Sequence, residues 1–355
     1  MYKCILVVTG KEKVRFLSLP GKLYRGERCP QNYEEEQFLL DGMHPLSNDF
    51  LFFPYIVFDK FHKTICRCAA TYYPNDNVAY LGFFEAYENE EAVKVMFEAV
   101  ERDARKRGIT KIIGPVNASI FIGYRFKVDN FDRVYTGEPY NKPYYKELWE
   151  KFGFTVSDTY VSNFLRKVTE KDNDELLQRI YNRYERKGYE VVNPTKGTFK
   201  KCLIDIYALM MDLYSGFSGY KMISQKQFLK MYSYLKHILK YDMVHLVYHN
   251  EKLMAFSVAV PNYGKVSIGD TSLIDKIKIL NMKKNPKEYV ILYVGADQSA
   301  PGLGGALMHV VKNKLFENKC TSIGALIKEG NITGKYYDSL YVSQTHYELF
   351  EKSLN

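Results

Sequence analysis

The sequence lacks most features that would mark a specialised class of protein. It has one tryptophan, Trp149, and no run of five or more basic residues, although its net charge is +9. A dedicated nucleic-acid surface is therefore not expected. The longest apolar runs, such as residues 50–58, are far too short to cross a bilayer, and the N-terminus has no secretory signal pattern. We expect a cytoplasmic protein without membrane contact.

Metal ligands and disulfides are not expected either. The 6 cysteines are dispersed, and only Cys66 and Cys68 lie two residues apart, with no second pair at the spacing of a zinc site. The 7 histidines are scattered and include no His-x-x-x-His pattern. The sequence therefore predicts free thiols and no metal centre.

The length of the chain predicts two domains. It has 355 residues, of which 46% are apolar, enough to fill two ordinary cores. A turn-forming cluster at residues 193–197 is the favoured junction. We predict a first domain at 1–168, a connecting helix and linker at 169–196, and a second domain at 197–355.

The first half alternates between strand and helix patterns. Residues 1–20 read as a strand with a turn, and the stretch 90–107 has apolar residues at helical spacing. The other expected elements are strands at 51–58, 64–72, 78–85, 111–115 and 154–166, and a helix at 141–152.

A similar order of elements returns in the second half. After a charged helix at 170–186 and a short strand at 189–192, we expect helices at 202–214, 224–240, 306–316 and near 334–340, and strands at 243–248, 253–261, 288–295, 321–327 and 343–350. The recurrence predicts an α/β (α+β) fold of two similar domains, each a twisted, mixed, mostly antiparallel sheet flanked by helices.

The most informative segment is the glycine-rich turn at 299–305, between an apolar strand and an amphipathic helix. Glycines let the backbone approach a ligand closely, and the first amides of a helix favour a phosphate. The alternative is a tight turn in which the glycines serve geometry alone. No Gly-Lys-Ser/Thr follows, and no dinucleotide-binding fingerprint is completed.

At this turn the sequence resembles the GNAT superfamily of acyl-coenzyme A-dependent N-acyltransferases. In that family a Gln/Arg-x-x-Gly-x-Gly/Ala loop holds the coenzyme A diphosphate; Gly302 and Gly304 match its small positions, whereas Ser299 replaces the Gln or Arg. The resemblance implies acetyl-CoA or another acyl-CoA as co-substrate. It implies cofactor contacts at Tyr293, Val294, Ser299, Gly302, Leu303, Gly304, Gly305 and Asn331.

The first half resembles the same family in part. Residues 78–108 look like its central strand and following helix, and 141–154 like its late Asn…Tyr…Gly-Phe motif. The acidic stretch 85–91 has no glycine pair and would repel a diphosphate. We therefore expect a degenerate unit without its own coenzyme A, as in bacterial tandem-GNAT proteins with a Gly-Pro-x-Asn segment, here 114–117.

The implied reaction needs a base for the amine and an acid for the departing thiolate. Candidate bases are Asp297, Glu329 and Asp270, although each also suits an exposed or capping role. Tyr336 and Tyr337 lie near the position of the family's acidic tyrosine, and packing is the alternative for both.

The acceptor site is expected where the first two helices of the second half meet. The residues expected there are Phe217, Tyr220 and Asp270, with Tyr144 from the first half and its neighbours Tyr140, Asn141, Tyr145 and Glu85 as a cover. An aromatic cleft of this kind fits a small amine or an amino acid.

Three functions stay open. The first is an acyl-CoA-dependent N-acyltransferase, which transfers groups other than aminoacyl groups to a small-molecule amine. The second is a Fem-type transferase that uses aminoacyl-tRNA, which the charge of +9 allows. The third is a non-catalytic protein that retains the fold and binds coenzyme A or another partner. The sequence leaves the oligomeric state open.

Overall fold

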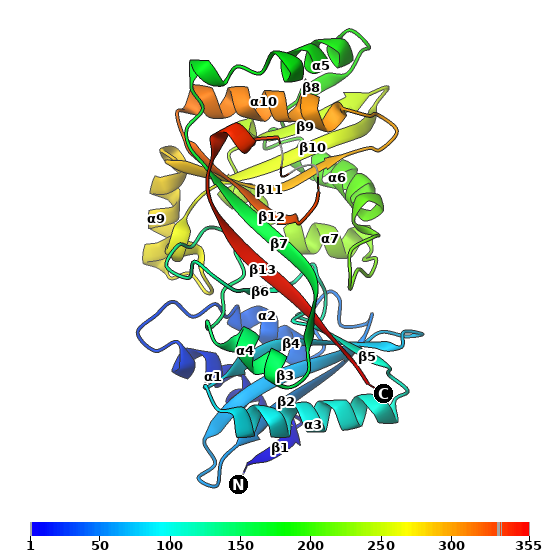
Figure 1. The fold of residues 1–355 in the computed structure, drawn as a ribbon, viewed down its shortest axis with the longest axis vertical. Helices are drawn as coiled ribbons and strands as arrows, with labels where there is room; N and C mark the ends of the chain where they lie inside the picture. Colours follow the sequence, from blue (N-terminus) through cyan, green and yellow to red (C-terminus); the bar gives the residue numbers. More distant parts are fainter. Residues whose placement is uncertain (1, 332–333, 335, 355) are drawn as a thin grey trace.

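The computed structural model describes residues 2–331, 334 and 336–354. Thirteen strands of this part of the chain form one sheet. The N-terminal half of the chain stacks on the C-terminal half along the longest axis, and both chain ends lie at the N-terminal half's end of the molecule (Figure 1).

The strands of the N-terminal half are β1 (Lys3–Leu6), β2 (Leu51–Phe58), β3 (Thr64–Tyr72), β4 (Val78–Ala86), β5 (Lys111–Gly114), β6 (Phe126–Lys127) and β7 (Thr155–Leu165). Those of the C-terminal half are β8 (Glu190–Val192), β9 (Val244–His249), β10 (Lys252–Pro261), β11 (Glu288–Ala296), β12 (Thr321–Lys328) and β13 (Tyr341–Ser353). Apart from the parallel pairs β4–β5 and β11–β12, the pairings are antiparallel.

The two halves exchange strands in the middle of the sheet. Strand β13, the last of the chain, pairs with β5 and β7, while β7 pairs with β12. The order is β1-β2-β3-β4-β5-β13-β7-β12-β11-β10-β9-β8, with β6 beside β13. In Figure 1, β7 and β13 run diagonally between the halves. Each half of the sheet therefore contains a strand from the other half. The domain boundaries at 1–168 and 197–355 stay a prediction.

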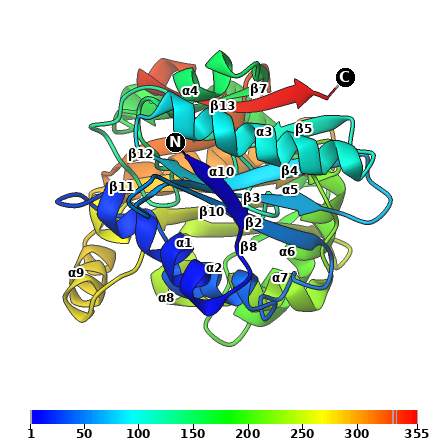
Figure 2. The ribbon, with the colours of Figure 1, turned by 90° about the horizontal axis from the view of Figure 1, so that it is seen from below.

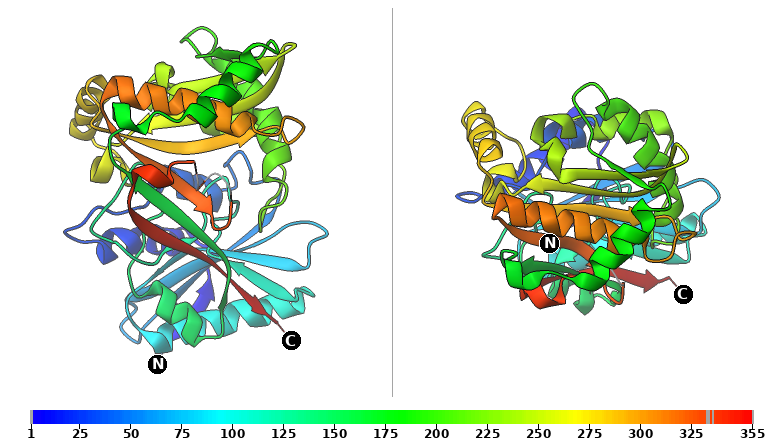
Figure 3. Two further views of the ribbon diagram at one scale, coloured as in Figure 1. Left: turned by 45° about the horizontal axis from the view of Figure 1, so that its top comes forward. Right: turned by 90° about the horizontal axis from the view of Figure 1, so that it is seen from above.

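Helices cover both faces of the sheet. The N-terminal half has α1 (Gly10–Leu23), α2 (Tyr33–Leu40), α3 (Glu90–Lys106) and α4 (Tyr145–Lys151), and α3 lies on the face opposite α1 and α2 (Figure 2). The C-terminal half has α5 (Glu175–Glu185), α6 (Phe199–Tyr214), α7 (Gln225–Tyr232), α8 (Leu235–Ile238), α9 (Leu273–Lys284) and α10 (Leu303–Asn318). Helices α5 and α10 lie side by side on one face, and α6 lies on the other (Figure 3).

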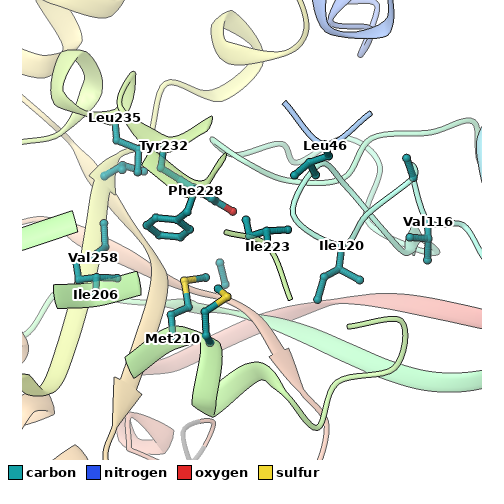
Figure 4. Close-up of a cluster of buried hydrophobic side chains, with 14 of the residues drawn as sticks. Leu46, Val116, Ile120, Ile206, Met210, Ile223, Phe228, Tyr232, Leu235 and Val258 are labelled. Carbon is teal, nitrogen blue, oxygen red and sulfur yellow. The ribbon is translucent and has the colours of Figure 1, made fainter. Parts of the chain in front are cut away.

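The hydrophobic core is continuous between the halves. One buried cluster contains Leu46, Val116 and Ile120 of the N-terminal half together with Met210 and Phe228 of the C-terminal half (Figure 4). Fully burying one such side chain contributes about 1.5–3 kcal/mol, so these contacts fix how the halves sit against each other.

Several elements differ from the sequence prediction. Residues 10–23 form helix α1 rather than part of a strand and turn, because Thr9 and Glu12 make a capping box and the helix buries Phe16 and Leu17 against the sheet. The helix expected at 224–240 is divided into α7 and α8, and α2 and α9 had not been expected. The helix expected near 334–340 lies partly outside the described residues, and its described end is a 3₁₀ turn at Asp338–Leu340.

Among the described residues, no helix has both the length and the apolar character needed to cross a membrane.

Candidate functional site

A cleft opens where β11 and β12 separate. The two strands pair in parallel from Glu288–Thr321 to Ile291–Gly324 and then diverge. On its other edge β11 has a bulge at Leu292, since Ala259 pairs with Ile291 and Val258 with Tyr293. Residues of both diverging strands line a cavity of about 420 Å³. Sheets that split in this way expose main-chain groups to a ligand.

The N-terminus of α10 closes one end of this cleft. Gly302 precedes the helix with φ 91°, a left-handed conformation that favours glycine. No side chain in the described part of the chain caps the helix there. Gly302 and Gly304 both line the cleft. A Cβ on Gly304 would lie 3.0 Å from the Tyr336 hydroxyl oxygen, so the absence of a side chain at Gly304 lets Tyr336 lie close to the first turn of the helix.

The turn before α10 is held by Asp297. Its carboxylate accepts hydrogen bonds from the Ser299 hydroxyl at 2.6 Å and the Ser299 amide at 2.9 Å, and forms an ion pair with Lys252 at 2.8 Å. The hydrogen bonds from Lys252 and Ser299 lower the pKa of Asp297 to about 2. Such a weak base is poorly suited to accept a proton from an amine.

The two candidate acids differ in their surroundings. Tyr336 is half-buried beside Gly304 and lines the cleft, and burial raises the pKa of its hydroxyl. Tyr337 is buried and donates its hydroxyl hydrogen bond to the Met308 carbonyl oxygen at 3.0 Å. Tyr336 therefore has the geometry better suited to donate a proton into the cleft.

The structure brings together about half of the residues expected at the site. The expected residues that line the cleft are Val294, Asp297, Gly302, Gly304, Asn331, Tyr336, Tyr337 and Phe217. Leu303 is buried in the core, and a Cβ on Gly305 would meet Leu177 of α5 at 3.2 Å. Ser299 is tied to Asp297, and Tyr293 lines a neighbouring cavity.

The remaining expected residues make other contacts. Glu329 is exposed and accepts a hydrogen bond from the Thr159 hydroxyl at 2.5 Å. Tyr220 donates to the Met211 carbonyl oxygen, and Tyr144 to the Ala86 carbonyl oxygen. Asp270 is exposed and accepts from the Tyr33 amide at 3.2 Å. These four side chains do not line the cleft.

The corresponding split in the N-terminal half is occupied by the chain itself. A Cβ on Gly82 of β4 would lie 2.1 Å from the Val116 carbonyl oxygen, and the Asn117 side chain accepts a hydrogen bond from the Phe83 amide at 2.7 Å. Helix α3 is capped by the side chain of Asn89, and its first turn is acidic. The start of α3 therefore differs from that of α10, which has no side-chain cap within the described residues.

Two further cavities extend from the cleft between the halves. An aromatic chamber of about 580 Å³ shares Tyr214, Phe217, Leu292 and Leu326 with the cleft. A polar pocket of about 290 Å³ in the N-terminal half adjoins this chamber. The residues that the chamber and the polar pocket share are Ile122, Gly123, Tyr124, Arg125, Gly137, Pro139, Ser267 and Gly269.

Glu85 is the acid in the polar pocket whose protonation is most perturbed. It is buried, accepts a hydrogen bond from the Tyr145 hydroxyl at 2.6 Å, and burial raises its pKa to about 7. The folded protein therefore binds this proton more tightly than the unfolded chain does. The free energy of unfolding of the wild type should fall as the pH rises from 4.5, the ordinary pKa of a glutamic acid, through about 7.

Glu85→Gln is expected to remove this pH dependence. Relative to the wild type, the variant should gain about 3 kcal/mol in free energy of unfolding between about pH 4.5 and pH 8, because glutamine cannot ionise. Urea unfolding at the two pH values measures the gain. Glu88→Gln, at an exposed position nearby, should leave the wild-type profile unchanged. Parallel profiles for Glu85→Gln and wild type would show that Glu85 ionises normally.

Two functional candidates were not identified from the sequence. Arg183 of α5 lies beside Gly302, since a Cβ there would be 3.7 Å from its Nη2 atom. Arg125 lines both the chamber and the polar pocket. Neither belongs to a local motif, because each is brought to the site by contacts between segments far apart in the sequence.

No group of three or more potential metal-ligating side chains occurs within residues 2–331, 334 and 336–354.

Comparisons with known proteins rest on structure alone. No family model matches the sequence, and no curated protein matches it. A tandem GNAT protein from the clavulanic acid biosynthesis pathway aligns over 100% of this chain and 99% of its own, with 10% identity and a TM-score of 0.52. A probable N-acyltransferase from Enterococcus faecalis V583 aligns over 100% of this chain and 73% of its own, with 9% identity and a TM-score of 0.53.

A further match is a fungal region described as a GCN5-related glucosamine N-acetyltransferase. It aligns over 99% of this chain and 38% of the larger fungal protein, with 11% identity and a TM-score of 0.53. At such identities the likeness concerns the fold, and both the expected fold class and the expected resemblance are confirmed. The chain has the fold of the GNAT superfamily in its tandem form.

Proposed function

We propose that the protein is an acyl-CoA-dependent N-acyltransferase that acts on a small amine or amino-acid-like acceptor. The observation that supports this most strongly is the cleft between β11 and β12, which ends at the uncapped N-terminus of α10. Main-chain amides and the helix dipole together favour a diphosphate at that point. The glycines keep the approach open.

The residues of the cleft fit the parts of an acyl-CoA. The amides of Gly304 and Gly305 would hold the diphosphate, since the Leu303 amide already donates to the Ala300 carbonyl oxygen at 3.0 Å. The main chain of β11 near Val294 would lie along the pantetheine arm. When bound, the cofactor supplies an activated acyl group. The bulge at Leu292 lies where the strands part and is the place at which a main-chain amide would polarise the thioester carbonyl.

Tyr336 would supply the proton for the leaving thiolate. Burial raises the pKa of its hydroxyl, so Tyr336 keeps its proton at neutral pH. Asp297 is the one carboxylate among the described residues that line the cleft, and its low pKa disfavours it as the base. We therefore expect the acceptor to react as the neutral amine.

Arg183 would replace the cation that the loop lacks. Ser299 stands where the family has Gln or Arg, whereas the Arg183 guanidinium approaches Gly302 from α5. We expect Arg183→Gln to raise the dissociation constant of acetyl-CoA by about three- to tenfold, because one exposed charge beside a diphosphate contributes modestly. Calorimetric titration at low and high salt measures the change. Arg102→Gln on α3, an exposed arginine of the other half, should bind acetyl-CoA as the wild type does. Equal affinities for both variants would remove Arg183 from the site.

Thermal unfolding with candidate ligands tests the proposed function. Acetyl-CoA at about 100 times its dissociation constant should stabilise the fold by about 2.7 kcal/mol. Stabilisation by tRNA that falls steeply with salt, without an effect of acetyl-CoA, would favour a Fem-type transferase. Acetyl-CoA binding without acyl transfer to any amine would favour a non-catalytic protein.

A further inference from the structure

Arg125 is a buried cation that has no acidic partner among the described residues. Its side chain is 7% exposed. Within the described residues, its one hydrogen bond runs from Nη1 to the Leu326 carbonyl oxygen at 3.3 Å, and its Nε atom is buried without a partner. No carboxylate in that part of the chain forms an ion pair with it. Unpaired guanidinium groups are costly to bury, so the free donors of Arg125 point to an anionic ligand.

The surrounding chain holds Arg125 in a defined position. Its guanidinium carbon lies 3.7 Å from the ring centroid of Tyr124 and 4.0 Å from that of Tyr160. The backbone at Arg125 has φ 69°, in the left-handed region, and its amide donates to the Pro115 carbonyl oxygen at 2.9 Å. The stacked rings stabilise the cation and leave its edge available for hydrogen bonds.

The nearby acids already have partners. In the polar pocket, Glu36 receives two hydrogen bonds from Arg67, and Glu138 forms an ion pair with Lys127 at 2.8 Å. The Glu85 carboxylate accepts a hydrogen bond from the Tyr145 hydroxyl. Arg67 also has an unpaired Nε, but its charge is neutralised by Glu36; among the described residues, Arg125 is the cation of this pocket wall that has no carboxylate partner.

Arg125 contacts a residue that lines the cleft in which we propose that the acyl group is transferred. The carbonyl that it contacts belongs to Leu326 of β12, which lines both the cleft and the aromatic chamber. Leu292, at the bulge of β11, also lines both cavities. A molecule in the chamber thus meets the cleft at one end and Arg125 along its wall.

We propose that Arg125 binds a carboxylate of the acceptor, and that the acceptor is an amino acid with a free carboxylate. This inference rests on the proposed function. The carboxylate would take the free donors of Arg125, and the aromatic wall formed by Tyr214, Phe217 and Tyr293 would receive the side chain. The amine would then lie at the mouth of the cleft.

The proposed acyl transfer conserves atoms and protons. The nitrogen of the neutral amine forms a bond to the thioester carbonyl carbon, the carbon–sulfur bond breaks, and the nitrogen loses one proton while the thiolate gains one. The positive charge of Arg125 also favours the neutral amine over the ammonium, because a nearby cation lowers the pKa of an ammonium group.

The test compares acids with matched amides. The twenty L-amino acids and their C-terminal amides are offered to the wild type with acetyl-CoA, and release of free thiol is measured. We expect the accepted amino acids to react with a kcat/KM at least about tenfold above that of their amides. Arg125→Gln should bring this ratio to about one, mainly through a higher KM for the acid, and Arg125→Lys should restore part of it.

Two controls separate folding and cofactor effects from acceptor recognition. Arg125→Gln should retain the wild-type dissociation constant for acetyl-CoA, which also shows that it is folded. Arg133→Gln, an arginine that stacks on Phe164 and pairs with Glu288, should keep the wild-type ratio of acid to amide.

Four outcomes would overturn the proposal. The first is equal use of acids and amides by the wild type, and the second is an unchanged ratio in Arg125→Gln. The third is that other amines are acetylated but no amino acid is. The fourth is a preference of the wild type for succinyl-CoA over acetyl-CoA that Arg125→Gln loses while its acid-to-amide ratio stays intact. The last outcome would mean that Arg125 binds a carboxylate of the acyl donor rather than of the acceptor. Failure of the wild type to bind acetyl-CoA, or binding without acyl transfer to any amine, would instead contradict the proposed function.

Discussion

Replacing Gly304 with leucine is expected to raise the dissociation constant of acetyl-CoA by at least about 100-fold. Gly304 lines the cleft in the first turn of α10, and its missing side chain leaves the main chain open. A Cβ there would already lie 3.0 Å from the Tyr336 hydroxyl oxygen, so a leucine side chain would have to displace Tyr336 or fill part of the cleft that both residues line. Calorimetric titration with acetyl-CoA measures the loss.

The variant should keep its fold. Leucine is a better helix former than glycine by about 0.8 kcal/mol, which offsets part of any local crowding. Gly21→Leu, in helix α1, is the matched control, because no atom lies within 4 Å of a Cβ at that position. Wild-type affinity in Gly304→Leu would place the cofactor elsewhere.

Replacing Phe350 with alanine is expected to destabilise the N-terminal half by about 3–5 kcal/mol, although Phe350 belongs to the last strand of the chain. Its side chain is 0% exposed. Its ring centroid lies 6.1 Å from that of Trp149 and 6.2 Å from that of Phe126, both in the core of the N-terminal half. The substitution would leave a cavity in that core.

Trp149 provides the readout, since it is the single tryptophan and contacts the altered site. Urea unfolding followed by its fluorescence should show a lower midpoint with little change in slope. Val342→Ala on the same strand, at a position 59% exposed, should shift the midpoint little. A small effect of Phe350→Ala would mean that the N-terminal half does not depend on β13.

Much of the fold could be predicted from local patterns. The apolar stripe at 90–107 and the strands around 51–85 have strong periodicity, and the structure has α3 and β2, β3 and β4 there. Helix α1 was missed because Gly10, Pro20 and Gly21 interrupt its pattern, although Thr9 and Glu12 cap it.

The exchange of β7 and β13 could not be predicted. Apolar and polar residues alternate along each strand in the same way whichever neighbour it pairs with. The pairing partner is selected by the burial of residues such as Tyr347 and Leu349 between the halves. Local sequence carries no information on such long-range partners.

The candidate site was predictable only where a motif marks it. The glycines at 302 and 304 do line a cleft at the start of a helix, as the resemblance implied. Arg125 and Arg183 have no sequence signal, because the roles that we propose for them depend on what lies beside them in space. Asp270 and Glu329 looked suitable as strand-end carboxylates, yet their hydrogen bonds lie away from the cleft.

A crystal structure of the protein with acetyl-CoA would show whether the start of α10 binds the diphosphate. We predict that oxygens of the diphosphate accept hydrogen bonds from the main-chain amides of Gly304 and Gly305, at about 2.7–3.2 Å, with the pantetheine arm between β11 and β12. A diphosphate bound at any other place, or a cleft that stays empty when acetyl-CoA is known to bind, would show that the start of α10 is not the cofactor site.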